Sequence, residues 1–185
     1  MIVNKIPIQA ILHHSTFNLD KVKYNLKPRK CGANEPIKAL WTSKFQTPIE
    51  NIEWVKYCLS HKNYRKGSHT CLWKLYPKEE FDLKVYQIDT IEDYENPLLS
   101  KIENDQEIKD LYPIDSKMIN YEEMFNLGYH GIWFTENMTR LKYENFSEKL
   151  GNIPLMMTSK LADSIVWFTT DWIGKIELTT DKVFE

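Results

Sequence analysis

The sequence predicts an α+β domain with a mainly antiparallel sheet, and three observations lead to this prediction. Segments with the β-branched and aromatic composition of strands outnumber helical segments along the chain. One helix has a strong start signal, and a second, shorter helix follows much later in the chain. Strands and helices do not alternate regularly, as they would in a parallel α/β fold. A length of 185 residues fits one domain covering residues 1–185.

Composition narrows the class of protein further. Hydrophobic residues make up 42% and aromatic residues 13% of the chain, which is enough to build a packed core. The net charge of -2 gives no strong field for nucleic acid, although a local basic patch is sufficient for an enzyme. Cys31, Cys58 and Cys71 form no C-x-x-C pair, which favours the reducing cytoplasm. No export signal and no apolar run of membrane-spanning length is visible.

The first half of the chain contains the clearest local signals. A strand is expected from Ile6 to Leu12, ending in the polar cluster His13-His14-Ser15-Thr16. Residues 27–36 are rich in turn formers and basic residues, which predicts a surface loop. Lys27 to Lys30 within it either contacts phosphates of NAD or of a nucleic acid, or is simply solvated. A short strand from Ala39 to Ser43 follows.

A helix is predicted to start at Thr47-Pro48-Ile49-Glu50, which combines an N-cap hydroxyl, a proline at the first helical position and a capping-box glutamate. Ile49, Ile52, Val55 and Leu59 recur at spacings of three and four, so they form one buried face. The helix is expected to end near Ser60.

The second half of the chain is predicted to contain most of the sheet. A short helix is capped by Asn120 and stopped by Gly128, and the acidic stretch from Glu92 to Ser116 is expected to form a long excursion with some helical content. Strands are expected at Thr70 to Leu75, Lys84 to Asp89, Gly131 to Thr135, Ser164 to Thr169 and Ile173 to Thr179, with a turn at Pro77 to Glu80.

Three strand boundaries carry the polar and aromatic side chains that suggest chemistry. At these residues the chain resembles the ADP-ribosyltransferase superfamily, in the branch of diphtheria toxin and the poly-ADP-ribose polymerases. Leu12 to Thr16 is similar to the family motif Leu-Tyr-His-Gly-Ser/Thr. Ala39 to Ser43 is similar to Gly-Ile/Leu-Tyr followed by a helix, and Asp163 to Trp167 is similar to Glu-Tyr-Ile/Val-Val-Tyr.

The resemblance implies split antiparallel β-sheets with flanking helices, NAD as co-substrate and no metal. It assigns catalytic roles to Asp163, His14 and Trp41. The residues that it implies for NAD binding lie on three segments: His14, Ser15 and Thr16; Trp41, Thr42 and Ser43; and, on the following helix, Trp54 and Tyr57.

The chemistry of NAD explains why such residues are needed. Breaking the bond between nicotinamide and ribose leaves an oxocarbenium-like sugar, which a nearby carboxylate stabilises. Asp163 is the candidate for this carboxylate, with Glu136 as a reserve. In the roles implied by the resemblance, His14 bonds a ribose hydroxyl, the Ser15 backbone holds the carboxamide and Trp41 stacks on the leaving ring.

The expected function is therefore transfer of ADP-ribose from NAD to a macromolecule, either nucleic acid, such as messenger RNA, or protein. Small transferases of this superfamily act as toxins, so a neutralising antitoxin is an expected partner, and a toxin–antitoxin–chaperone anti-phage system is a related group. NAD hydrolysis and NAD-dependent removal of an RNA 2'-phosphate remain alternatives, and the second relies on arginines of which this chain has only Arg29, Arg65 and Arg140.

A further alternative is a catalytically inactive module that binds NAD, a nucleotide or a partner protein. The aspartate in place of the family's glutamate and the tryptophan in place of its tyrosine favour this alternative. Each residue also has an ordinary explanation, because histidines at strand ends and buried tryptophans are common in protein cores. No phosphate-binding glycine loop or metal-ligand cluster is visible in the sequence.

Overall fold

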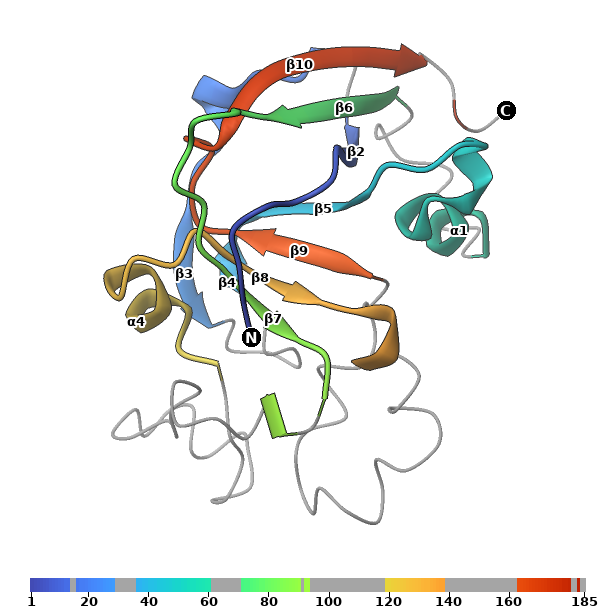
Figure 1. Ribbon diagram of the computed structural model, residues 1–185. Coiled ribbons are helices and arrows are strands. Elements are labelled where there is room, and N and C mark those ends of the chain that lie inside the picture. Colours follow the sequence, from blue (N-terminus) through green and yellow to red (C-terminus); the bar gives the residue numbers. More distant parts are fainter. Residues whose placement is uncertain are drawn as a thin grey trace.

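The computed structural model describes residues 1–13, 16–28, 36–60, 71–90, 92–93, 119–138, 163–180 and 183, which form a mixed α+β fold with few helices (Figure 1). The strands are β1 (Ile2–Val3), β2 (Gln9–His13), β3 (Asn25–Pro28), β4 (Pro36–Lys38), β5 (Leu40–Lys44), β6 (Cys71–Pro77), β7 (Val85–Ile88), β8 (Gly131–Phe134), β9 (Ser164–Trp167) and β10 (Ile173–Thr180). The helices are α1 (Glu53–Ser60) and α4 (Tyr121–Asn126), with short 3-10 turns η1 (Leu19–Lys21) and η2 (Ile49–Asn51).

Eight strands form one curled sheet in the order β1-β7-β8-β9-β5-β2-β6-β10. Strands β7 and β8 pair in parallel, and the other pairs of this sheet are antiparallel. The curl brings β6 and β10 across the top of the sheet in Figure 1, away from β7 and β8. Strands β3 and β4 form a separate antiparallel pair. The predicted α+β class and mainly antiparallel sheet are therefore confirmed.

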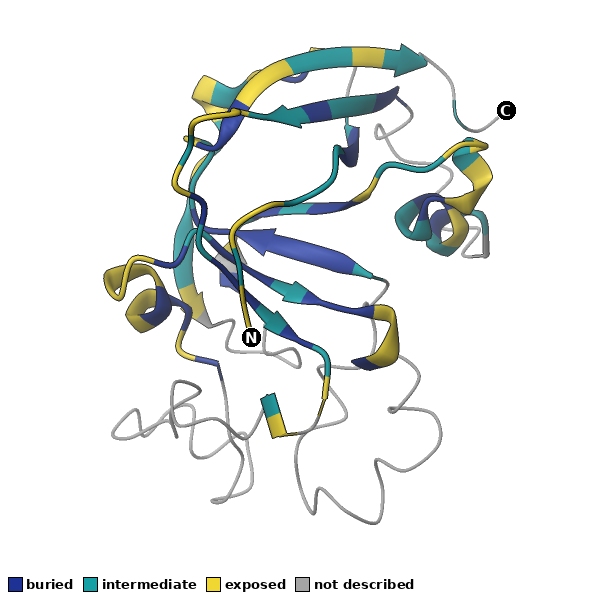
Figure 2. Cartoon of the chain, in the orientation of Figure 1, coloured by how far each residue is buried: buried dark blue, intermediate teal, exposed yellow. Residues whose placement is uncertain are grey.

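Apolar side chains fill both sides of the sheet. Every residue of β9 is buried, which places this strand at the centre of the core (Figure 2). One cluster around Trp167 and Trp172 includes residues from β2, β5, β6, β7, β9 and β10, so the curled sheet wraps around it. On the other side, Val55 and Cys58 of α1 and Ile52 just before it pack against β2 and β6. A third cluster lies beneath α4. Burial of these faces is the main contribution to stability.

The sequence located most elements to within a few residues. The cap and stop of α4 are confirmed, because Asn120 Oδ1 accepts a hydrogen bond of 2.9 Å from the Glu123 amide and Gly128 has a φ of 81°. The five predicted strands between residues 70 and 179 and the strand from Ala39 to Ser43 are observed with small shifts. Most of the acidic stretch from Glu92 to Ser116 lies outside the described residues.

Three predictions about the first half need correction. The predicted loop 27–36 contains parts of two strands, in which Pro28 pairs with Pro36, because proline is tolerated in an isolated edge pair. Strand β2 begins at Gln9 rather than Ile6. The signal at Thr47 starts the 3-10 turn η2, whose N-cap Pro48 has no side-chain cap bond, and α1 itself begins at Glu53. Of the predicted face, Ile52 and Val55 are buried and Ile49 and Leu59 are partly buried, and the end at Ser60 is as predicted.

None of the helices in the part of the chain described above is long and apolar enough to cross a membrane.

Candidate functional site

Strands β2 and β5 separate from each other like the arms of a fork. They pair only at Gln9 with Lys44 and at Ala10 with Ser43. From Ile11 to His13, β2 continues to pair with β6 on its other side, but no longer with β5. An opening therefore forms inside the sheet between the end of β2 and the start of β5.

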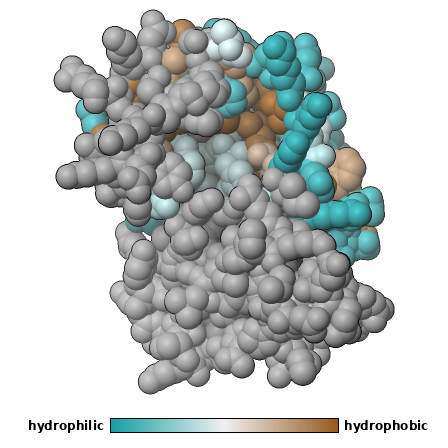
Figure 3. Space-filling model, turned by 180° about the vertical axis from the view of Figure 1, so that it is seen from behind, coloured by the Kyte–Doolittle hydropathy of each residue, from teal (hydrophilic) through white to brown (hydrophobic). Residues whose placement is uncertain are grey.

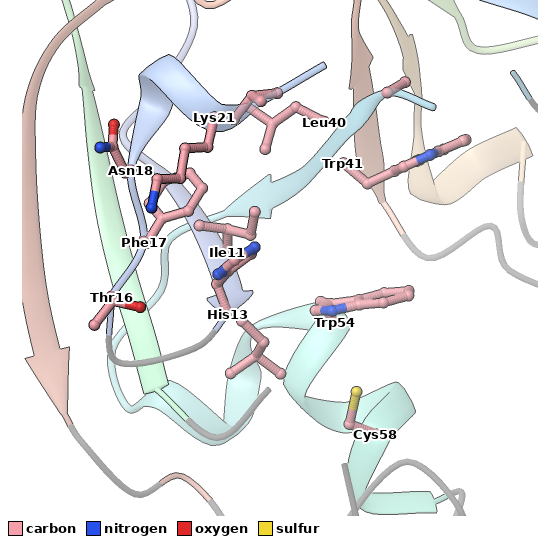
Figure 4. Close-up of a pocket in the computed structure, with 13 residues that line it drawn as sticks. Ile11, His13, Thr16, Phe17, Asn18, Lys21, Leu40, Trp41, Trp54 and Cys58 are labelled. Atoms are coloured by element: carbon pink, nitrogen blue, oxygen red, sulfur yellow. The ribbon is translucent and has the colours of Figure 1, made fainter. Parts of the chain in front are cut away.

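A cavity of about 510 Å³ occupies this opening (Figure 4). One wall comes from β2 with Ile11, Leu12 and His13, and the facing wall comes from Ala39, Leu40 and Trp41 at the start of β5. In the view from behind, hydrophobic residues lie in a recess of the described surface and hydrophilic residues border it (Figure 3). Cavities of a few hundred Å³ with mixed walls are typical of small-molecule sites.

The helix α1 closes one side of the cavity with Trp54 and Cys58. The Trp54 ring stacks on the Tyr57 ring at 5.4 Å with an interplanar angle of 9°, so Tyr57 supports the indole from behind. Figure 4 shows the Trp54 ring beside His13 at the cavity. Burial raises the pKa of the Cys58 thiol to about 11, so this group is neutral at physiological pH and is a poor nucleophile.

The Trp41 indole is directed differently from the Trp54 indole. In Figure 4 the Trp41 ring points away from the other labelled side chains. It stacks on Phe134 at 6.3 Å and 19°, and it packs against the cluster beneath α4. Trp41 borders the cavity, but Trp54 presents the aromatic ring to it.

Thr42 and Ser43 lie at the closed end of the fork and do not line the cavity. Both are buried. The Thr42 hydroxyl donates to Gln9 Oε1 at 2.8 Å and accepts from Trp167 Nε1 at 2.8 Å. Because its donor and one of its two acceptor positions are used, Thr42 ties β2, β5 and β9 together. The predicted contacts of Thr42 and Ser43 with NAD stay predictions.

Asp163 lies beside the closed end of the fork, just before β9. Its carboxylate accepts a hydrogen bond of 2.5 Å from Trp133 Nε1. Burial raises the pKa of the carboxyl above its ordinary value, and the Trp133 bond partly opposes this effect. The negative charges of Glu53 and Glu136 also raise the pKa, whereas Lys44 lowers it.

The structure does not bring the Asp163 carboxylate and the Trp41 indole together. Trp41 is paired with Val166, and side chains alternate along β9, so Asp163 lies on the opposite face, with Ile165. The two positions are also about 10 Å apart along the strand. Asp163 is not among the described residues that line the cavity. Its predicted catalytic role, and that of the reserve carboxylate Glu136, stay predictions.

His14 and Ser15 lie outside the described residues, so their predicted contacts with NAD stay predictions. The described residues of the first motif, Leu12, His13 and Thr16, line the cavity. The His13 and Phe17 rings are 4.7 Å apart. Sequence reasoning missed His13, Phe17 and Lys21 as lining residues, although the alternation of Ile11 with His13 already indicated that these two side chains share a face.

Comparisons with known protein families, with curated proteins and with solved structures found no match. Among the described residues, no three side chains of His, Cys, Asp or Glu gather in a way that could hold a metal ion.

Proposed function

We propose that this protein binds NAD in the cavity between β2 and β5 and transfers its ADP-ribose to a macromolecule, with release of nicotinamide. One observation carries the proposal. The three segments that resemble transferase motifs, far apart in sequence, belong to β2, β5 and β9, which are adjacent strands of one sheet. The cavity opens between the first two of them, where a split sheet is expected from the resemblance.

The walls of the cavity suit the parts of a dinucleotide. A volume of about 510 Å³ falls within the ordinary range for cofactor sites. The Trp54 ring offers a flat apolar surface on which nicotinamide or adenine stacks. The His13 imidazole and the Thr16 hydroxyl supply polar groups for ribose hydroxyls, and Lys21 supplies a positive charge for phosphate.

Transfer breaks the bond between the nicotinamide nitrogen and C1' of ribose, and the bonding electrons leave with nicotinamide. An oxygen or nitrogen nucleophile of the acceptor forms the new bond to C1' and gives up its proton to a base. A carboxylate stabilises the positive charge that develops on the ribose, which is the role proposed for Asp163. Asp163 reaches this position only with a movement of β9 or of its side chain, since its carboxylate now bonds Trp133.

That hydrogen bond also favours a second candidate, an inactive module that binds NAD or a nucleotide without turnover. A carboxylate held outside the cavity leaves the binding walls intact and removes the catalytic group. Binding and chemistry therefore have to be measured separately.

The decisive experiment supplies NAD labelled in the adenine ring and follows the label. Attachment to protein or nucleic acid, with nicotinamide released, supports transfer. Free labelled ADP-ribose indicates hydrolysis, and unchanged NAD with measurable binding indicates the inactive module. The variants Asp163→Asn and His14→Ala are expected to abolish attachment. Asp171→Asn serves as the matched control, because this exposed carboxylate accepts a hydrogen bond from the neighbouring Thr169 hydroxyl, whose oxygen in turn accepts from the Asp171 backbone amide. Absence of NAD binding at millimolar concentration contradicts both candidates.

A toxin of this kind slows growth when it is produced without an antitoxin. We expect wild-type protein to arrest a bacterial host and Asp163→Asn to be tolerated at the same level of folded protein. Equal growth of both cultures counts against the toxin role. It does not bear on NAD binding, which the experiment with labelled NAD measures.

A further inference from the structure

The segment after η1 presents lysines on one side only. Val22 and Tyr24 pack against the cluster inside the curled sheet, and Leu26 packs against the cluster beneath α4. Side chains alternate along extended backbone, so Lys23 and Lys27 face outward. Both are exposed, as is Lys21 at the end of η1.

Lys38 on β4 extends this row. It pairs with Asn25, which is an outward position of β3, and it is exposed. We name the four residues Lys21, Lys23, Lys27 and Lys38 the basic strip. None of the four forms an ion pair with another described residue. Their charges are therefore available to a partner.

The net charge of the whole chain, -2, does not indicate this local excess of lysines. Residues 21–44 contain seven basic residues and one acidic residue, whereas the rest of the chain contains 17 basic and 25 acidic residues. A local positive surface on an otherwise negative protein guides a polyanion to one place and repels it elsewhere. The four exposed lysines form no ion pairs with described residues, so no such ion pair explains why this segment contains so many of them.

The basic strip leads directly to the cavity. Lys21 is one of its lining residues, and Figure 4 shows this side chain beside Asn18 and Phe17 at the cavity. At the other end, Lys38 immediately precedes Ala39 and Leu40, which also line the cavity. A chain bound along the strip therefore passes the opening between β2 and β5.

We propose that the basic strip binds the phosphate backbone of single-stranded nucleic acid, which makes nucleic acid the acceptor. This inference rests on the proposed function, because the cavity supplies the reaction. Proteins that bind single strands combine positive charges along the backbone with aromatic rings for the bases, and here Lys21 of the strip lines the same cavity as Trp54. In a duplex the bases are stacked and paired, so they cannot enter the cavity.

The test measures binding of a fluorescent single-stranded RNA of about 15 nucleotides by anisotropy over a range of salt concentrations. The variant K23E/K27E is compared with K5E/K78E, which changes the net charge equally at exposed lysines outside the strip. We expect K23E/K27E to weaken binding about tenfold and to reduce the salt slope by about 1.4, with little effect of K5E/K78E.

Equal losses in both variants contradict the basic strip, because they indicate net charge alone. Absence of RNA binding by the wild type also overturns it. If polyglutamate displaces the labelled RNA as effectively as unlabelled RNA of equal charge does, the partner is an acidic protein, and the proposal of nucleic acid is overturned. Thermal unfolding checks that both variants fold. NAD binding, measured separately without RNA, reports on the cavity, so failure of the strip and failure of the proposed function are distinguishable.

Discussion

The indole of Trp133 holds the carboxylate of Asp163 through a hydrogen bond of 2.5 Å at the closed end of the fork. Trp133 lies on β8 and Asp163 just before the adjacent strand β9, both on the face opposite to Trp41. This bond fixes the one acidic side chain that the resemblance assigns to catalysis at a place outside the cavity. Its energetic and functional consequences are open to direct measurement.

Asp163 is expected to lower stability at neutral pH. Burial raises the pKa of its carboxyl, so the folded protein holds the proton more tightly than the unfolded chain does. Above the raised pKa the charge costs stability, and this cost disappears below the ordinary aspartate pKa of about 3.9. We expect Asp163→Asn to unfold at higher urea concentration than wild type at pH 7, and the difference to shrink toward pH 3. A variant less stable at pH 7 contradicts this explanation.

Trp54 is expected to contribute more to NAD binding than Trp41. Its ring lies at the cavity, and stacking of a base on an aromatic ring contributes about 1–3 kcal/mol. We expect Trp54→Ala to weaken NAD binding, measured by calorimetry, by roughly 5- to 150-fold. Trp41→Phe preserves the packing against Phe134 and is expected to change binding little. If Trp41→Phe weakens NAD binding more than Trp54→Ala does, Trp41 is the ring that stacks on NAD, and this prediction is wrong.

The hydroxyl of Thr42 is expected to stabilise the closed end of the fork. Thr42→Val removes the partner of both Gln9 Oε1 and Trp167 Nε1, and each buried group left unpaired costs about 1–3 kcal/mol. The neighbouring Ser43 hydroxyl is buried without a hydrogen-bond partner, so Ser43→Ala is the control and is expected to be nearly neutral. Urea denaturation measures both. Similar losses of stability in Thr42→Val and Ser43→Ala would show that the two hydrogen bonds of Thr42 do not stabilise the fold.

Gly131 on β8 is expected to tolerate no side chain. A Cβ atom at this position would lie 2.6 Å from the Val166 carbonyl oxygen, which belongs to the backbone of β9 and cannot move aside. At Gly174 the nearest atom would be Lys78 Cγ, at 3.1 Å, in a flexible side chain. We expect Gly131→Ala to destabilise the protein by about 1–3 kcal/mol and Gly174→Ala to have a smaller effect in the same urea experiment.

The sequence predicted the elements whose signals are local. Asn120 and Gly128 delimit α4 because both act through backbone groups within one turn. The continuous apolar run Ile165 to Phe168 indicates a strand buried on both faces, and every residue of β9 is buried.

The candidate site was predictable only in part. The order of the motifs indicated three strands, and these prove to be neighbours. The face on which Asp163 lies depends on the pairing register of β9 with β5. A register shift of one residue moves every side chain of a strand to the other face, so this face could not be predicted from the sequence alone. The role of Trp54 as the ring at the cavity depends on how α1 packs, which is likewise non-local.

The most direct test of the central claim observes the indole N–H resonances of the 6 tryptophans by NMR during titration with NAD, each assigned through its Trp→Phe variant. If NAD binds between β2 and β5, the Trp54 resonance shifts most, and those of Trp133 and Trp172, which do not line the cavity, stay in place. Shifts at Trp133 or Trp172 with Trp54 unchanged, or no shift at saturating NAD, would contradict the claim.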